Sequence, residues 1–140
     1  MRKVKEEDFK IFWKEADKKY NLANTYYWYP LIEKPIENTI VSYRTTELLK
    51  SRFKETLERN IQELNVLMYL KMEYQIDGSE YYIIESKEFD LDRYSEEYYI
   101  TTDLSGLIYY SHEDTISFAG DIFINIINDL NIMLPEIQRI

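Results

Sequence analysis

The sequence concentrates its polar chemistry in two predicted turns, Asp103 to Gly106 and Ser111 to Asp114. The second turn contains His112, the only histidine of the chain, between a serine and two acids. A histidine base needs a nucleophile and an orienting group close to it in space, and sequence neighbours seldom adopt that geometry. We therefore expect His112 to be a turn residue hydrogen-bonded to its own backbone, not a catalyst.

The sequence lacks the common metal and nucleotide signatures. With 0 Cys and 1 His, the usual zinc ligand sets are excluded. Asp90 and Asp92 resemble the start of a calcium loop, but the glycine and the distal glutamate of an EF-hand do not follow. Neither a GxxxxGK[ST] nor a GxGxxG pattern occurs. We expect no catalytic residue, no metal site and no cofactor.

Acidic residues are concentrated in the second half of the chain. Residues 1–72 carry 14 Lys+Arg against 11 Asp+Glu, a net of +3. Residues 73–140 carry 3 against 15, a net of −12, and the two halves together give the −9 of the chain. A field of this sign repels nucleic acid and anionic membranes, and it attracts a basic protein or a cation. Plain solubility is the competing explanation.

We interpret the acidic run from Glu85 to Asp103, extended by the next turn, as a candidate surface for a basic protein partner. Such charges would chiefly speed association, and exposed tyrosines on the same strand would supply contact area. A solvated face without a partner is the alternative. The candidate residues are Asp90, Asp92, Glu96, Glu97, Tyr99, Asp103, His112 and Glu113.

A second candidate surface lies between Thr25 and Pro35, where four aromatic residues follow one another and include Tyr27 and Trp28. The two prolines of this stretch exclude a central strand and a continuous helix. Its rings either cover the edge of the core or anchor an interface, since Tyr and Trp suit both roles.

Apolar periodicity predicts two N-terminal helices and one C-terminal helix. The first spans residues 6–20, with acids in its first turn and lysines in its last. The second runs from about residue 45 to 64, with Lys54 and Glu58 on its outer side. The last begins at Asp121 and is stopped by Pro135. Their apolar stripes are Phe9, Phe12, Trp13, Ala16 and Tyr20; Leu49, Phe53, Leu57, Ile61 and Leu64; and Ile122, Phe123, Ile126, Ile127, Leu130, Met133 and Leu134.

The period changes to two after Asn65, which predicts a strand over residues 67–76. Continuation of the helix through 65–72 is the competing interpretation, since Leu and Met favour helices. Asp77-Gly78 favours a two-residue type I′ turn into a strand over 79–86. That turn would pair Tyr74 with Tyr81 and Met72 with Ile83 on the inner face.

Shorter patterns complete the predicted sheet. Residues 39–43 suggest a short strand, and residues 87–95 suggest an edge strand or an irregular crossing. Three further strands follow at about 97–101, 107–110 and 116–118. Tyr98 and Ile100 are expected to point inward and to alternate with outward residues. Gly106 is expected to supply the positive φ of the turn before the second of these strands.

These elements give one α+β domain over residues 1–140: two N-terminal helices, an antiparallel meander of about five strands, and a C-terminal helix packed on the sheet. The sequence has no apolar run of about 18 residues that could span a membrane. Its first ten residues mix both charges and do not form a signal peptide. We expect a cytoplasmic protein.

The segment from Tyr98 to Leu130 resembles the C-terminal part of the SMI1/KNR4-like (SUKH) superfamily. In that superfamily, strands ending in a turn acid precede an aromatic-led helix, and the matching positions here are Glu113 and the run Phe118 to Phe123. The Leu-Pro start and the Asn-Gly-Gly end of the family's central helix are absent from the first half. Many bacterial members are immunity proteins that neutralise a toxin delivered by neighbouring cells, which implies a toxin as partner.

The sequence therefore favours a small acidic binding protein, an immunity or antitoxin-like inhibitor of a basic toxin domain. An enzyme or small-ligand protein that uses His112 and nearby carboxylates is the rival hypothesis. A structural or phage-assembly component is a third.

Overall fold

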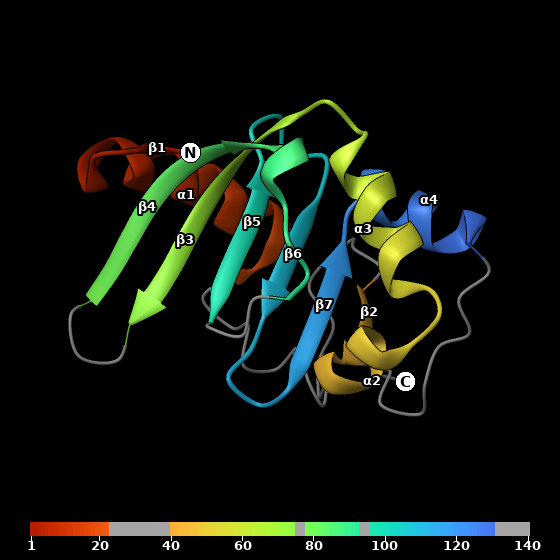
Figure 1. The fold of residues 1–140 in the computed structure, drawn as a ribbon. Coiled ribbons are helices and arrows are strands. Elements are labelled where there is room, and N and C mark those ends of the chain that lie inside the picture. Colours follow the sequence, from red (N-terminus) through yellow and green to blue (C-terminus); the bar gives the residue numbers. More distant parts are fainter. Residues whose placement is uncertain (23–39, 75–77, 93–95, 131–140) are drawn as a thin grey trace.

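The computed structural model describes residues 1–22, 40–74, 78–92 and 96–130. They form one antiparallel sheet with helices on both faces (Figure 1), so the α+β class is confirmed. Within these ranges the sheet has seven strands, not about five, in the order β1-β4-β3-β5-β6-β7-β2. The strands are β1 (Arg2–Lys3), β2 (Ile40–Arg44), β3 (Leu67–Tyr74), β4 (Gly78–Glu85), β5 (Glu97–Thr101), β6 (Leu107–Tyr110) and β7 (Thr115–Ala119).

The sheet is not the simple meander that we expected, because β5 pairs with β3 instead of β4. The chain leaves β4 through a short 3-10 helix, η2 (Ser86–Glu88), and then crosses the sheet towards β5. Within residues 86–92 this crossing is irregular and contains no edge strand. The expected short strand near residue 40 is confirmed as β2, which pairs with β7 at one edge. β1 covers part of the other edge and is too short for an alternating pattern to reveal.

The β3–β4 hairpin exists, but its predicted register is wrong. Tyr74 pairs with Gly78 and Met72 with Glu80, which leaves three residues, 75–77, between the paired ends instead of two. The predicted Asp77-Gly78 turn falls partly on those three residues, which lie outside the described ranges. The strand itself is confirmed over residues 67–74. The competing helix through 65–72 is wrong, because α3 ends at Gln62 and Asn65 has a positive φ of 56°.

The predicted second helix is two helices, α2 (Thr45–Lys50) and α3 (Lys54–Gln62). Ser51 separates them: its backbone is extended, and its hydroxyl donates to the Leu48 carbonyl at 2.8 Å. The same oxygen accepts a hydrogen bond from the Phe53 nitrogen, so the serine side chain replaces helical backbone bonds. The break shifts the helical phase, and Leu48 is buried in place of Leu49.

The other two helices begin where they were predicted. α1 (Glu6–Tyr20) has the predicted bounds, and Asn21 ends it in the left-handed conformation. α4 (Asp121–Asp129) begins at the predicted residue. Its expected continuation to Pro135, with Met133 and Leu134 on its apolar face, falls on residues outside the described ranges. None of the helices in those ranges has the length and apolar composition that crossing a bilayer requires.

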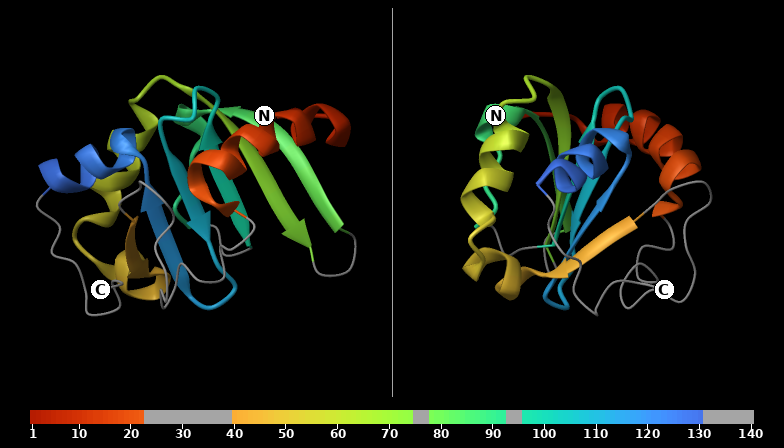
Figure 2. Two further views of the ribbon diagram at one scale, coloured as in Figure 1. Left: turned by 180° about the vertical axis from the view of Figure 1, so that it is seen from behind. Right: turned by 90° about the vertical axis from the view of Figure 1, so that its right-hand side faces the viewer.

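Helices cover both faces of the sheet, which Figure 2 shows in its edge-on view. We call the face that carries α2 and α3 the front face and the face that carries α1 the back face. The front core includes Leu57 and Ile61 of α3 and Phe123 and Ile127 of α4; the back core includes Ala16 and Tyr20 of α1. Because both faces are covered, all five residues of β5 are buried. The expected alternation of inward and outward side chains in β5 is therefore wrong.

The turn between β5 and β6 lies against the start of α4. Leu104, not Gly106, has the positive φ, at 64°. Gly106 is needed for space: a Cβ there would lie 2.5 Å from side-chain atoms of both Ile122 and Phe123. At Gly120, which has a φ of 86°, a Cβ would lie 2.4 Å from the Ser105 carbonyl oxygen, so this position also has no room for a side chain. Together the two glycines fix the end of the sheet to the helix.

Candidate functional site: an acidic surface

The structure divides the ten predicted partner-binding residues into separate groups. Asp90 and Asp92 lie beside α3, while Glu96, His112 and Glu113 gather where β5 begins and β6 ends. Asp103 lies at the opposite end of β5, in the turn before β6. Tyr27 and Trp28 lie outside the described residues. The remaining two, Glu97 and Tyr99, are not on the surface.

Glu97 and Tyr99 are 0% and 1% exposed, so the prediction that they contribute to a binding surface is wrong. Both point to the front face, where Phe89 packs edge-on against the Tyr99 ring at 5.1 Å. The Tyr99 hydroxyl donates to a Glu97 carboxylate oxygen at 2.5 Å. A buried carboxylate must be hydrogen-bonded to be tolerated, so this pair belongs to the architecture of the core.

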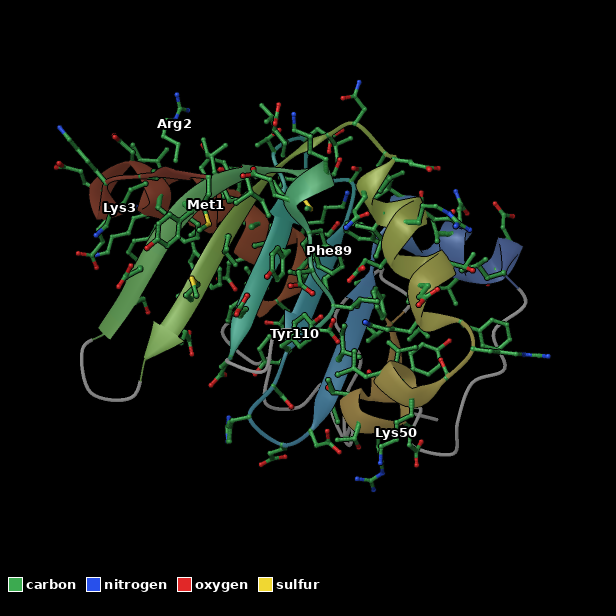
Figure 3. The ribbon with its side chains drawn as sticks, viewed as in Figure 1. Met1, Arg2, Lys3, Lys50, Phe89 and Tyr110 are labelled. Carbon is green, nitrogen blue, oxygen red and sulfur yellow. The ribbon has the colours of Figure 1, made fainter. Side chains whose placement is uncertain are left out.

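The segment after η2 presents two carboxylates because its apolar residues are buried. Phe89 and Leu91 are buried in the front core, and the Tyr110 hydroxyl donates to the Leu91 carbonyl at 3.0 Å. Figure 3 shows Phe89 and Tyr110 on the front side of β5 and β6, where this segment crosses the sheet. The alternation leaves Asp90 and Asp92 exposed.

α3 completes the acidic cluster, by which we mean Glu58, Asp90 and Asp92. Carboxylate oxygens of the three residues lie within 4.8 Å of one another. Glu58 accepts a hydrogen bond from the Leu91 nitrogen at 2.7 Å, and Asp90 accepts one from the Asp92 nitrogen at 2.8 Å. These backbone donors hold two of the carboxylates in fixed positions.

One cation lies in the acidic cluster. The Lys54 ammonium is 2.8 Å from Asp92, and this hydrogen bond raises the pKa of Lys54. Lys54, Glu58 and Gln62 recur every four residues, so they form one stripe of α3 that faces the segment from 89 to 92. The expectation that Lys54 and Glu58 lie only on the outer side of a helix is therefore wrong. Three carboxylates and one ammonium leave an excess of two negative charges.

Burial and this local field act together on the tyrosine beneath the segment. Burial raises the pKa of Tyr110 well above its usual range, and the nearby carboxylates of Glu97, Asp90, Glu58 and Asp92 raise it further. The hydroxyl therefore stays protonated at any physiological pH. It acts as a permanent donor to the Leu91 carbonyl.

A second acidic group surrounds His112 in the turn between β6 and β7. The Nδ1 of His112 lies 3.3 Å from a Glu96 carboxylate oxygen, and its Nε2 lies 3.9 Å from a Glu113 carboxylate oxygen. Glu96 also accepts a hydrogen bond from the Tyr109 hydroxyl at 2.8 Å. The expected backbone bonding of the turn is made by Ser111 and not by His112. The Ser111 hydroxyl lies 2.5 Å from the Thr115 hydroxyl. It also accepts hydrogen bonds from the backbone nitrogens of Glu113 and Thr115.

Asp103 has a local structural role. Hydrogen bonds from the Ser105 hydroxyl and the Ser105 backbone nitrogen lower the pKa of this carboxyl group. At the same end of the sheet, Tyr20 donates to the Leu104 carbonyl and thus fastens α1 to this turn.

The participation of Glu58 and Lys54 was missed because their partners are more than 30 residues away in the sequence.

No family model matches the chain, and neither a curated protein nor a solved structure is similar enough to count as a match. The resemblance of residues 98–130 to the SUKH superfamily therefore stands as a proposal.

Proposed function

We propose that this chain is a binding protein that inhibits a basic protein partner, as immunity proteins of the SUKH superfamily do. The observation that carries the proposal is the acidic cluster, in which backbone nitrogens hold Glu58 and Asp90 within 4.8 Å of Asp92. Carboxylates already held in place lose little conformational entropy when a lysine or arginine of a partner joins them.

The field of the whole chain supports the same partner class. The acidic cluster belongs to a molecule whose residues 73–140 carry a net charge of −12. Long-range attraction of this kind raises association rates and disfavours partners of like charge. Nucleic acid and anionic membranes are therefore poor partners for this surface.

The arrangement around His112 favours binding over the rival hypothesis of an enzyme. The hydroxyl nearest in sequence, that of Ser111, is engaged with Thr115 and with backbone nitrogens of its own turn. The ring nitrogens of His112 face the carboxylates of Glu96 and Glu113, and among the described residues they are hydrogen-bonded to no hydroxyl that could act as a nucleophile. No observation on the described residues favours the third hypothesis, a structural or phage component.

The proposal is tested by capturing partners from a lysate of the native host with the parent protein and with an Asp90→Asn/Asp92→Asn variant. We expect a basic protein that the parent retains and the variant retains poorly, because the variant removes two charges without changing side-chain size. The captured protein should also associate more slowly with the variant than with the parent. Equal retention by both proteins would contradict the proposal.

A further inference from the structure

A groove crosses the C-terminal end of α3, the start of β3 and the end of β4. It consists of two adjoining hollows of about 500 and about 340 Å³ that share Leu67 and Glu85 as lining residues. The larger hollow is bounded by the C-terminal end of α3 and the smaller one by β1. Figure 3 shows Met1 and Arg2 of the smaller hollow beside β4. Gln62, Val66 and Ser86 line the larger hollow.

The groove brings exposed apolar side chains together in one concave site. Among the described residues, three large apolar side chains are exposed: Met1 at 60%, Leu67 at 48% and Ile11 at 71%. Met1 and Leu67 both line the smaller hollow, together with Ile83. Exposed apolar side chains that share one concave site, rimmed by charge, are typical of interaction surfaces.

The walls of the groove are held by a network around Ser86. The Ser86 backbone nitrogen donates a hydrogen bond to the Val66 carbonyl at 2.8 Å. The Ser86 hydroxyl accepts a hydrogen bond from the Val66 nitrogen and donates one to the Gln62 carbonyl. Gln62 in turn donates to the Phe89 carbonyl at 2.8 Å. The end of α3 is thereby fixed to the start of β3, and a ligand would meet a preformed surface.

The charges of the rim select the occupant. Three acids line the two hollows, Glu63, Glu85 and Glu88, and the C-terminal end of α3 adds a partial negative charge. Of the two bases, Arg2 lines only the smaller hollow, and Lys87 lines the larger one, which therefore has two acids against one base. Lys87 lies 3.0 Å from Glu85 in a highly exposed pair, which is worth little and is easily exchanged. Glu88 pairs with the amino terminus at 2.7 Å. A lysine or arginine of a ligand can thus replace Lys87 at Glu85.

We infer that this groove binds an extended segment of the basic protein partner, with one large apolar side chain against Leu67 and a flanking lysine or arginine at Glu63 and Glu85. The inference rests on the proposed function for the identity of the partner. It adds an apolar anchor, which slows dissociation, to the acidic cluster, which speeds association.

The test is a selection of short random peptides displayed on phage, with the parent protein as bait. We expect enriched peptides that place one large apolar residue beside Lys or Arg. Leu67→Ser should weaken their binding about tenfold, as loss of an interface anchor does. Ile11→Ser is the control: it removes an even more exposed apolar side chain outside the groove, and binding should be unchanged.

Three results would overturn the inference: no enriched peptide, enriched peptides that bind Leu67→Ser as tightly as the parent, or peptides weakened by Asp90→Asn/Asp92→Asn instead. In the third case the proposed function stands and only the groove is wrong. If Leu67→Ser fails to fold, Glu63→Gln replaces it, because neutralising this rim acid should weaken the same peptides. Equal binding to Glu63→Gln would then count against the groove.

Discussion

The two faces of the sheet are covered by different kinds of contact. On the front face, α2, α3 and α4 bury mainly aliphatic side chains against the strands. On the back face, α1 is held by rings: Phe9 stacks on Tyr81 at 4.5 Å, and Phe12 packs on Tyr69 at 4.2 Å. Aliphatic contacts stabilise mainly through the surface that they bury. Ring contacts also have preferred geometries, so they constrain the position of the helix.

The difference extends to charge. On the back face, the Lys71 ammonium lies 4.2 Å from the Trp13 ring and pairs with Glu73 at 3.0 Å, so its charge is used to fix α1. On the front face, the acidic cluster keeps an excess of negative charge on the outside of the helical layer. The back face is thus a structural support, and the front face carries the charge that we assign to a partner.

The largest expected effect comes from placing a charge in the front core. Ile126→Asp puts an unpaired carboxylate among Phe123, Ile127 and the residues of α3. We expect this variant to be unfolded, since the free-energy cost of burying an unpaired charge exceeds the free energy of unfolding of most domains. Far-ultraviolet circular dichroism checks it, and a native-like spectrum with a cooperative melt would show that α4 is not docked as described.

A core substitution on the back face should destabilise the protein without unfolding it. Phe9→Ala removes a buried ring that contacts Tyr81, Tyr69 and Trp13, and we expect a loss of about 3 kcal/mol in the free energy of unfolding. Urea denaturation measures this loss. A loss below about 1 kcal/mol would mean that α1 contributes little to the folded state.

The two faces also differ in how much of them could be predicted. The apolar stripes of α1 and α4 and the strand β3 followed from periodicity, which reports burial of one face. The strands β4 and β6 were located from the turns that precede them. Periodicity failed at β5, because a strand that is covered on both sides has no polar face. It also failed at Ser51, where a side chain competes with the helix backbone, and at Glu58, whose partner at Leu91 is distant in sequence.

A pair of tyrosines separates a satisfied from an unsatisfied hydroxyl in the front core. Tyr99→Phe removes the donor to the buried Glu97, and we expect a loss of about 2 kcal/mol. Tyr43 is equally buried, but its hydroxyl has no hydrogen-bond partner among the described residues. Tyr43→Phe should therefore leave stability unchanged or raise it by about 1 kcal/mol. Equal losses in urea denaturation would contradict this difference.

The smallest expected effect is on pH dependence at the turn next to Tyr20. The pKa of Asp103 is lower in the folded chain than its ordinary value of 3.8, so its contribution to stability is present above that value. The contribution is lost as the pH falls through the lower, folded pKa. Asp103→Asn should slightly reduce stability at neutral pH and flatten the loss of stability in acid. Thermal melts across an acid pH series check this, and a parallel profile would count against it.

If the acidic cluster steers a basic partner, the association rate must fall as salt rises, and this salt dependence can be measured directly. The variants are Asp90→Asn/Asp92→Asn and, as the matched control, Glu7→Gln/Asp8→Asn, which removes the same charge from exposed positions on α1. We predict that the first associates about fivefold more slowly at low salt, with a shallower salt dependence. The control should match the parent. Equal rates and equal salt slopes for all three proteins would contradict the account.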